Sequence, residues 1–310
     1  MATETCSDAL PPAPASAADI STFTTDEPKP AETSLAWETF KRPRLHKYPL
    51  SIDDLTFEAY VGRGADGVVF KAQGGGQTVA VKVFPDNKPP PPHKYAIMYW
   101  AFKRECTNCM LLDKITTRLC QARATGQPVF VHPEPKTHRQ ALRNLRAFSD
   151  EGRVDSAHPP DDGFVPLPLD LAITVNPCLG WMEASGKQIG GVLWRFHKLA
   201  NFDDAQTYYC IVYNFVESGD VRDLDEDKIV EHTKFFHTVG FLLNTFNFTN
   251  WRGDAVLVDF SDLTSPFRKY EWLPRGYANQ LARAEQGVRF GMDQLRQHPY
   301  YGRQDRPGAR

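Results

Sequence analysis

A glycine-rich stretch that runs on into a strand constrains the fold of this chain more than any other sequence feature. Residues 62–69 have the pattern G-x-G-x-x-G-x-V. Glycines in this pattern let backbone amides approach phosphate oxygens, because no Cβ stands in the way. A dinucleotide-binding fold would need a helix directly after the last glycine, but residues 68–72 alternate like a strand and turn back at Gly74-Gly-Gly76. The pattern therefore excludes that fold and predicts an antiparallel hairpin over residues 57–84.

A lysine in the second strand of this hairpin calls for an anionic partner. In Val79-Ala-Val-Lys82 the period-two alternation of a strand places Ala80 and Lys82 on one face and the valines on the other. Residues 95–119 carry apolar residues at helical spacing, and Glu105 lies on the packed side of this helix. We therefore expect Glu105 to pair with Lys82 while Lys82 also faces a phosphate. The alternative is an ordinary surface lysine and glutamate on a twisted hairpin.

The order of glycine-rich loop, strand lysine and helix glutamate resembles the N-terminal lobe of eukaryotic-type protein kinases. Later segments are similar to further kinase elements: residues 178–182 to the fourth strand, 211–217 to the fifth strand and hinge, and 256–261 to the strand that ends in the metal-binding aspartate. The resemblance is greatest to truncated kinase-like proteins of fungi, with an Asn-Trp-x-Gly stretch shortly before Asp-Phe-Ser, here Asn250 to Gly253 and Asp259 to Ser261.

This resemblance implies an α+β, protein-kinase-like two-lobed fold, with an antiparallel β-sheet in the N-lobe and a truncated helical C-lobe. Residues 1–45, rich in Ala, Pro, Ser, Thr and acidic residues, are expected to form a disordered N-terminal tail. The N-lobe would take residues 46–217, with an insertion rich in Pro, His and charged residues at about 121–175. Residues 218–310 would form the truncated C-lobe with a basic C-terminal helix and tail.

Helical spacing of apolar residues predicts three further helices. They span about residues 139–148 within the insertion, 228–241, and 277–298 before a proline. From Arg268 onward nine basic residues face four acidic ones, so this end of the chain is basic. We expect it to complete the core.

The resemblance also implies a site for ATP and Mg²⁺. Tyr213 would be the gatekeeper, and the backbone of residues 214–216 would face the adenine. Asn250 and Asp259 would hold Mg²⁺ as two hard oxygen ligands, although a buried strand-end aspartate that caps a turn would give the same sequence. The residues implied to face or support the nucleotide are Gly62, Gly64, Gly67, Val69, Ala80, Lys82, Glu105, Tyr213, Asn214 and Val216.

The catalytic aspartate of the kinase mechanism is missing from the position where the family has it. If Asn250 is the asparagine of H-R-D-x-x-x-x-N, the aspartate position holds Thr245, which cannot accept a proton at pH 7. Asp254 and Asp262 are nearby carboxylates that could substitute. Only 51 residues follow Asp259, too few for the helical lobe that binds peptide substrates in the family.

A pseudokinase is the function that this combination favours: a nucleotide-binding regulatory or scaffolding module that contacts protein partners. Two alternatives stay open. One is an atypical ATP-dependent phosphotransferase with a substitute base, and the other is an interaction protein that binds no nucleotide.

The composition of the chain limits which partners and which cellular compartment we expect for it. The 36 Lys and Arg residues nearly balance the 38 Asp and Glu residues, so no global field attracts nucleic acid. No apolar run approaches the ~18 residues of a membrane span, and the N-terminus has neither a secretory signal nor a transit peptide. Six cysteines are too few for a disulfide scaffold, and Cys106 and Cys109 are expected to be core thiols. We therefore expect an intracellular protein without membrane contact, cytoplasmic or, if the basic residues 41–47 act as an address, nuclear.

Overall fold

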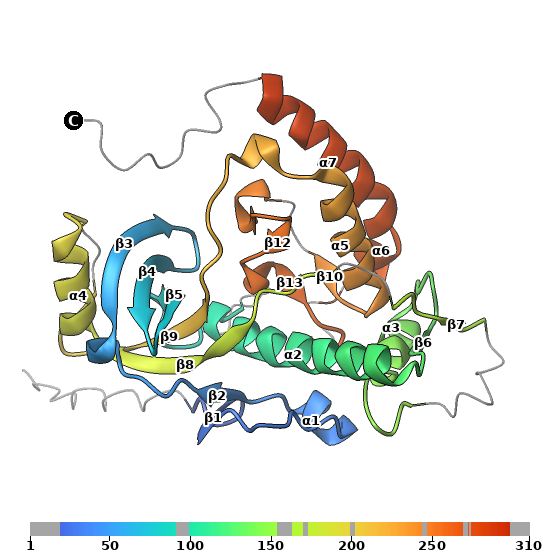
Figure 1. The fold of residues 1–310 in the computed structure, drawn as a ribbon, viewed down its shortest axis with the longest axis horizontal. Helices are drawn as coiled ribbons and strands as arrows, with labels where there is room; N and C mark the ends of the chain where they lie inside the picture. Colours follow the sequence, from blue (N-terminus) through green and yellow to red (C-terminus); the bar gives the residue numbers. More distant parts are fainter. Residues whose placement is uncertain are drawn as a thin grey trace, which may run out of the picture.

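A seven-stranded sheet at one end and a group of helices at the other make up the fold (Figure 1). The computed structural model describes residues 19–90, 99–153, 163–169, 173–198, 202–243, 247–268, 272 and 274–297. Within these ranges the chain has a mixed α+β fold with seven α-helices. The long helix α2 (Ala101–Thr125) runs beside the sheet toward the other end of the molecule. No helix in these ranges is long and apolar enough to cross a membrane.

The main sheet combines a five-stranded antiparallel part with two parallel strands at one edge. Its order is β1-β2-β8-β9-β5-β4-β3. From β8 to β3 every neighbouring pair is antiparallel, whereas β1 pairs with β2, and β2 with β8, in parallel. The prediction of an antiparallel sheet is therefore wrong at this edge. The strands are β1 (Thr24–Pro28), β2 (Leu45–Lys47), β3 (Thr56–Arg63), β4 (Val68–Gly74), β5 (Gln77–Phe84), β8 (Cys178–Ser185) and β9 (Thr207–Asn214).

Residues 19–45 belong to the sheet and the core, so the prediction of a disordered tail is wrong for them. They form β1, the short helix α1 (Trp37–Lys41) and the start of β2. Phe23, Leu35 and Phe40 are buried in the larger hydrophobic core, and this burial offsets the entropy lost on ordering the segment. The sequence did not predict these elements, because their few apolar residues are spaced irregularly among Ala, Pro, Ser and acidic residues. Residues 1–18 of the predicted tail lie outside the described residues.

The larger core surrounds α2 and includes residues of the sheet and of the C-terminal half of the chain. Phe102, Cys106 and Leu112 recur at helical spacing and are fully buried, which fixes the face that α2 turns to the sheet. Cys106 and Cys109 are free buried thiols, as predicted. The helix ends at Gly126, which adopts a left-handed conformation with φ 68°. The helix predicted over 95–119 is observed over residues 101–125, so it begins and ends later than predicted. Residues 95–98 are not among those described.

A second core lies on the opposite face of the sheet, under α4 (Gly186–Arg195). Ser185 and Gln188 form a capping box, in which Ser185 Oγ accepts from Gln188 N at 3.2 Å and Gln188 Oε1 accepts from Ser185 N at 2.9 Å. Ile189 and Leu193 are buried against the sheet residues of this core. The sequence did not predict α4, because its three glycines lower helix propensity and interrupt the apolar pattern.

The range predicted as an insertion contributes to the larger core. It contains the end of α2, α3 (His138–Arg146), and a two-stranded ladder of β6 (Phe130–Val131) and β7 (Val165–Pro166). Helix α3 confirms the short helix predicted over 139–148. Leu145 and Phe148 are fully buried, and Arg118 of α2 donates from Nε to Phe148 O at 3.1 Å and pairs with Asp150. Residues 148–150 of this segment are therefore tied to α2.

The C-terminal part consists of helices separated by short strands. Helix α5 (Glu226–Thr238) confirms the one predicted over 228–241, while α6 (Pro274–Ala278) and α7 (Gln280–Gln297) replace the single helix predicted over 277–298. Val288 and Met292 of α7 are fully buried on its α5 side. The basic tail from residue 298 lies outside the described residues. The short strands pair as β10 (Leu242–Leu243) with β13 (Leu263–Thr264) and β11 (Trp251–Arg252) with β12 (Val256–Leu257).

Four 3₁₀ turns complete the described structure: η1 (Ile52–Asp54), η2 (Val221–Asp223), η3 (Phe248–Asn250) and η4 (Phe260–Asp262). Within residues 256–261, implied to be the strand that ends in the metal-binding aspartate, only the two-residue β12 is a strand, and the chain then bends into η4 at Asp259. This bend sets the position of the Asp259 side chain.

Candidate functional site

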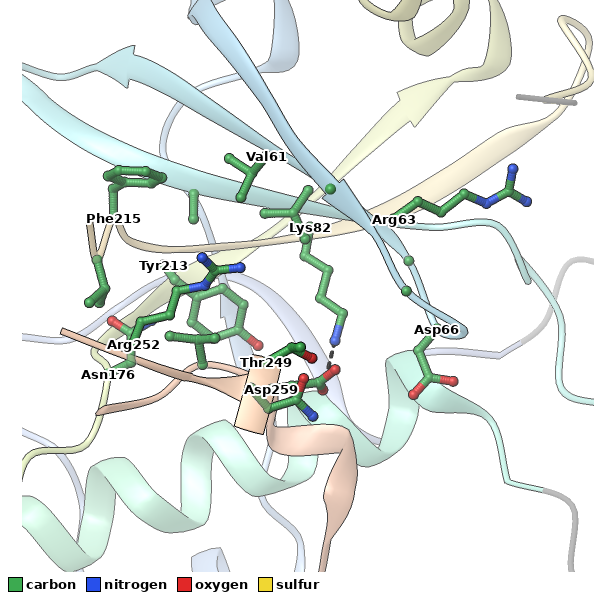
Figure 2. Close-up of a pocket in the computed structure, with 18 of the residues that line it drawn as sticks. Val61, Arg63, Asp66, Lys82, Asn176, Tyr213, Phe215, Thr249, Arg252 and Asp259 are labelled. Carbon is green, nitrogen blue, oxygen red and sulfur yellow. Dashed lines mark hydrogen bonds and ion pairs between the residues drawn. The ribbon is translucent and has the colours of Figure 1, made fainter. Parts of the chain in front are cut away.

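A cavity of about 180 Å³ lies between the main sheet and the segments around β11 and β12 (Figure 2). Strands β3, β4 and β5 form its roof, η3, β11 and the end of β12 its floor, and residues 213–216 one end. A single water needs about 10–15 Å³ of such space, so the cavity is open and not filled by side chains.

The structure brings the predicted site residues together at this cavity, with two exceptions. Glu105 lies behind Lys82 and does not line the cavity, and Thr245 lies outside the described residues. The predicted residues that do line it are Gly62, Gly64, Gly67, Val69, Ala80, Lys82, Tyr213, Asn214, Val216, Asn250 and Asp259.

The glycine-rich stretch forms the tight turn between β3 and β4. Gly64 N donates to Gly67 O at 2.9 Å, which closes the turn. A Cβ at position 67 would lie 2.8 Å from Val83 O and 3.2 Å from Cγ of Lys82. Gly67 is therefore required because the loop backbone lies directly over the strand that carries Lys82. A Cβ at Gly64 would meet nothing within 4 Å.

Lys82 is held between two carboxylates. Its Nζ lies 2.6 Å from Oε2 of Glu105 and 2.8 Å from Oδ1 of Asp259, which confirms the predicted pairing with Glu105. Figure 2 shows the side chain reaching from the roof down to Asp259. Burial opposes the charge on Lys82, but the carboxylates of Asp259 and Glu105 outweigh it and raise the pKa of Lys82 above its usual value. Lys82 is thus a fixed cation at the inner end of the cavity.

Burial affects the pKa values of Glu105 and Asp259, the two partners of Lys82, differently. Burial raises the pKa of Glu105 to about 7, with the nearby Lys82 ammonium opposing that rise and the Asp259 carboxylate adding to it. Burial would also raise the pKa of Asp259, but the charge of Lys82 and the hydrogen bonds from Lys82 and Ser261 outweigh it and lower that pKa. Asp259 is therefore the partner that is ionised at neutral pH, whereas Glu105 gains and loses its proton close to neutral pH.

Tyr213 fixes the far side of Glu105. The Tyr213 hydroxyl donates to Glu105 Oε1 at 2.5 Å, so both oxygens of this fully buried carboxyl are occupied. The same hydroxyl lies 3.3 Å from Sγ of Cys109, and the Tyr213 ring packs edge-on against Phe260. The residue predicted as gatekeeper therefore supports the lysine–glutamate pair from inside the core.

Asn250 and Asp259 offer the oxygen atoms expected of a Mg²⁺ site. Asp259 uses Oδ1 for Lys82 and for the Ser261 backbone (3.0 Å) and hydroxyl (2.6 Å), so it also caps η4, the structural role that the sequence left open. Asn250 donates from Nδ2 to Asp262 Oδ2 at 2.6 Å, which orients its amide. One carboxylate and one amide oxygen, completed by phosphates and water, suit Mg²⁺. The described residues contain no cluster of three or more Asp, Glu, His or Cys side chains that could hold a metal ion without such help.

A carboxylate in the glycine-rich loop ties the roof of the cavity to its floor. Ser261 Oγ lies 2.7 Å from Asp66 Oδ2 and shares its one hydrogen between Asp66 and Asp259. The Tyr99 hydroxyl lies 3.0 Å from both Asp66 oxygens. Ser261 lies two residues after Asp259. The loop is thus closed onto the segment that carries Asp259. Sequence reasoning missed this role of Asp66, because a tie between residues 195 positions apart leaves no local pattern.

Two backbone amides at the end of β9 are already used inside the protein. Asn214 N donates to Pro177 O at 3.1 Å and Phe215 N donates to Thr78 O at 3.3 Å. Beside them the cavity is lined by Asn176, Thr249 and Arg252, none of which the sequence indicated. No motif marks these positions. Only their place in the fold reveals them.

The two carboxylates predicted as substitute bases do not line the cavity. Asp254 pairs with Lys228 on the exposed surface, and Asp262 accepts from Asn250. Of the side chains that line the described cavity, only Asp66 and Asp259 carry carboxylates.

Comparisons with known proteins give no match: neither a protein-family model nor a curated protein sequence is similar to this chain. The geometry of the cavity therefore carries the functional argument.

Proposed function

We propose that this chain is a pseudokinase, which binds ATP and Mg²⁺ as structural or regulatory ligands in a protein-kinase-like fold and contacts protein partners through its surface. The observation that carries the proposal is the position of Lys82. Its ammonium group stands beneath a glycine turn, at the inner end of an open cavity, between Glu105 and Asp259. A fixed cation beneath a glycine turn is what the phosphates of a nucleotide require.

The arrangement around the cavity supports the two-lobed part of the proposal. The antiparallel strands β3, β4, β5, β8 and β9 lie on one side of the cavity, and β11, β12 and the helices α5 and α7 lie on the other. Residues 214–216 connect the two parts at one end of the cavity. Bound Mg²⁺ would be held by Asp259 and Asn250 and would offset the negative charge of the phosphates.

The carboxylates favour binding over phosphoryl transfer. Asp259 is engaged by Lys82 and Ser261, and Asp66 is engaged by Tyr99 and Ser261. Although burial opposes the effect, the charge of Lys82 lowers the pKa of Asp259, so Asp259 is a weak acceptor for the proton of a substrate hydroxyl. Removing a general base typically costs ~10²–10⁴-fold in rate. The residue at the family's base position, Thr245, has no carboxylate.

Calorimetric titration with ATP and Mg²⁺ tests the proposal. The wild type should bind, and Lys82→Met should lose at least tenfold in affinity because the phosphates lose their cation. Lys187→Met is the matched control, since Lys187 is exposed on α4 and does not line the cavity. Equal affinity in the wild type and Lys82→Met would refute the site, and absence of binding would favour the interaction protein without nucleotide.

Phosphotransfer is tested separately with radiolabelled ATP. The proposal expects no transfer to protein or small-molecule acceptors. Transfer that disappears in Asp259→Asn would instead establish the atypical phosphotransferase.

A further inference from the structure

A buried amide in the wall of the cavity lacks a hydrogen-bond partner. Asn176 is 3 % exposed, and its Oδ1 atom accepts no hydrogen bond from any described residue. Native proteins pair nearly all buried polar side-chain atoms, so a buried oxygen without a donor needs an explanation. Asn176 lines the same cavity as Lys82. A ligand group in that cavity is the donor that would satisfy it.

The backbone on both sides of Asn176 is fixed. Val175 forms a parallel bridge with Leu257 of β12, and Pro177 O accepts the Asn214 amide at 3.1 Å. Asn176 therefore stands between the floor strand and the hinge. In Figure 2 its side chain lies at the end of the cavity near Tyr213, Arg252 and Phe215, away from the ammonium group of Lys82. It is placed to meet the part of a ligand that is farthest from the phosphates.

This end of the cavity suits a flat ring with a polar edge. Val61 and Ala80 lie in the roof and Val258 in the floor, so a ring between them would contact apolar side chains on both faces. The backbone amides of Asn214 and Phe215 cannot serve the ring edge, because they donate to Pro177 and Thr78. The Asn176 amide offers an acceptor and a donor side by side at this end of the cavity, which suits the polar edge of such a ring.

We propose that Asn176 is a specificity-determining residue that selects adenine by its 6-amino group. The inference rests on the proposed nucleotide site and specifies which base that site recognises. Asn176 Oδ1 accepts a hydrogen from the 6-amino group, and Nδ2 can donate to the adjacent ring nitrogen, the two-bond pairing that asparagine side chains form with adenine. A purine without this amino group leaves Oδ1 buried without a donor, and the complex is weaker by the cost of that unpaired atom.

Two ligands that differ only in this group test the inference. Titrations compare ATP with purine riboside 5′-triphosphate, which lacks the 6-amino group, each with Mg²⁺. The wild type should bind ATP about tenfold more tightly. Asn176→Leu, of similar volume and without polar atoms, should bind the two ligands equally. Asn87→Leu is the same substitution at a residue that does not line the cavity, and it should keep the wild-type preference.

The outcomes separate this inference from the proposed function. Binding of both ligands with equal affinity by the wild type, or an unchanged preference in Asn176→Leu, overturns the role of Asn176 and leaves the nucleotide site standing. Absence of binding of either ligand overturns both. Folding of Asn176→Leu is checked by its melting temperature without nucleotide, which should equal or exceed that of the wild type, because the substitution removes an unpaired buried atom.

Discussion

Removal of the Lys82 ammonium group should destabilise the protein in a way that depends on pH. Breaking a buried ion pair from one side costs about 3–5 kcal/mol, because the remaining charge is left without a partner. Asp259 keeps 24 % of its side-chain surface and can be solvated in part, whereas Glu105 keeps none. The fully buried Glu105 therefore determines how the loss in Lys82→Met varies with pH.

The sign follows from the pKa of Glu105. Burial raises this pKa from an ordinary 4.5 to about 7, so the folded state binds the proton more tightly than the unfolded chain does. The corresponding stability is fully present below pH 4.5 and falls by roughly 3 kcal/mol as pH rises to about 7. Above pH 7 the wild-type curve flattens, since Glu105 is ionised and paired with Lys82. In Lys82→Met the carboxyl stays protonated to higher pH, so stability keeps falling by about 1.4 kcal/mol per pH unit.

Urea unfolding at pH 6, 7 and 8.5, followed by tryptophan fluorescence, measures this difference. The gap between wild type and Lys82→Met should be constant below pH 7 and should widen by about 2 kcal/mol between pH 7 and pH 8.5. Adding Glu105→Gln to Lys82→Met should remove the widening, because the titrating carboxyl is gone. A gap that is the same at all three pH values would refute the assignment of the buried charge to Glu105.

Two further substitutions test the roof and the back of the cavity. Gly67→Ala places a Cβ 2.8 Å from Val83 O and should lower the free energy of unfolding by about 1–3 kcal/mol. Gly64→Ala, whose Cβ would meet nothing within 4 Å, should leave it unchanged. Equal effects of the two substitutions would contradict the close approach of the loop to β5. Tyr213→Phe removes the donor to Glu105 Oε1 and should lower the free energy of unfolding by about 1–3 kcal/mol. Tyr209→Phe should lower it less, because the Tyr209 hydroxyl has no hydrogen-bond partner among the described residues. The same urea assay measures both variants, and no difference between them would refute the support of Glu105 by Tyr213.

Local patterns were sufficient to predict the chemical centre of the cavity. The alternation along β5 put Ala80 and Lys82 on one face, and helical spacing put Glu105 on the packed side of α2. Each prediction needs only the geometry of one strand or one helix. The same reasoning found α3 and α5, whose apolar residues recur regularly along short stretches.

Contacts between distant segments were beyond the sequence. The bond from Ser261 to Asp66 and the position of Asn176 between β12 and the hinge depend on how the whole chain folds. The N-terminal strands were missed for the same reason, since three residues of β2 show no period and are held by the strand beside them. When two interacting residues lie in different segments of the chain, the spacing of residues within either segment does not reveal the interaction.

The parallel strands β1 and β2 also act as a cover for an edge that would otherwise be open. Without them β8 would be the end of the sheet, with a row of unpaired backbone groups and the Trp181 side chain uncovered. Trp181 Nε1 donates to Thr25 O at 2.9 Å, and Tyr48 N donates to Trp181 O at 2.7 Å, so the cover is hydrogen-bonded as well as packed. Exposed edge strands recruit other strands. A shortened chain that begins at residue 46, the boundary that composition suggests, would keep the cavity residues but lose β1 and the acceptor of Trp181 Nε1. The edge of its sheet would be less covered and more prone to self-association, so studies of ligand binding should retain residues 19–45.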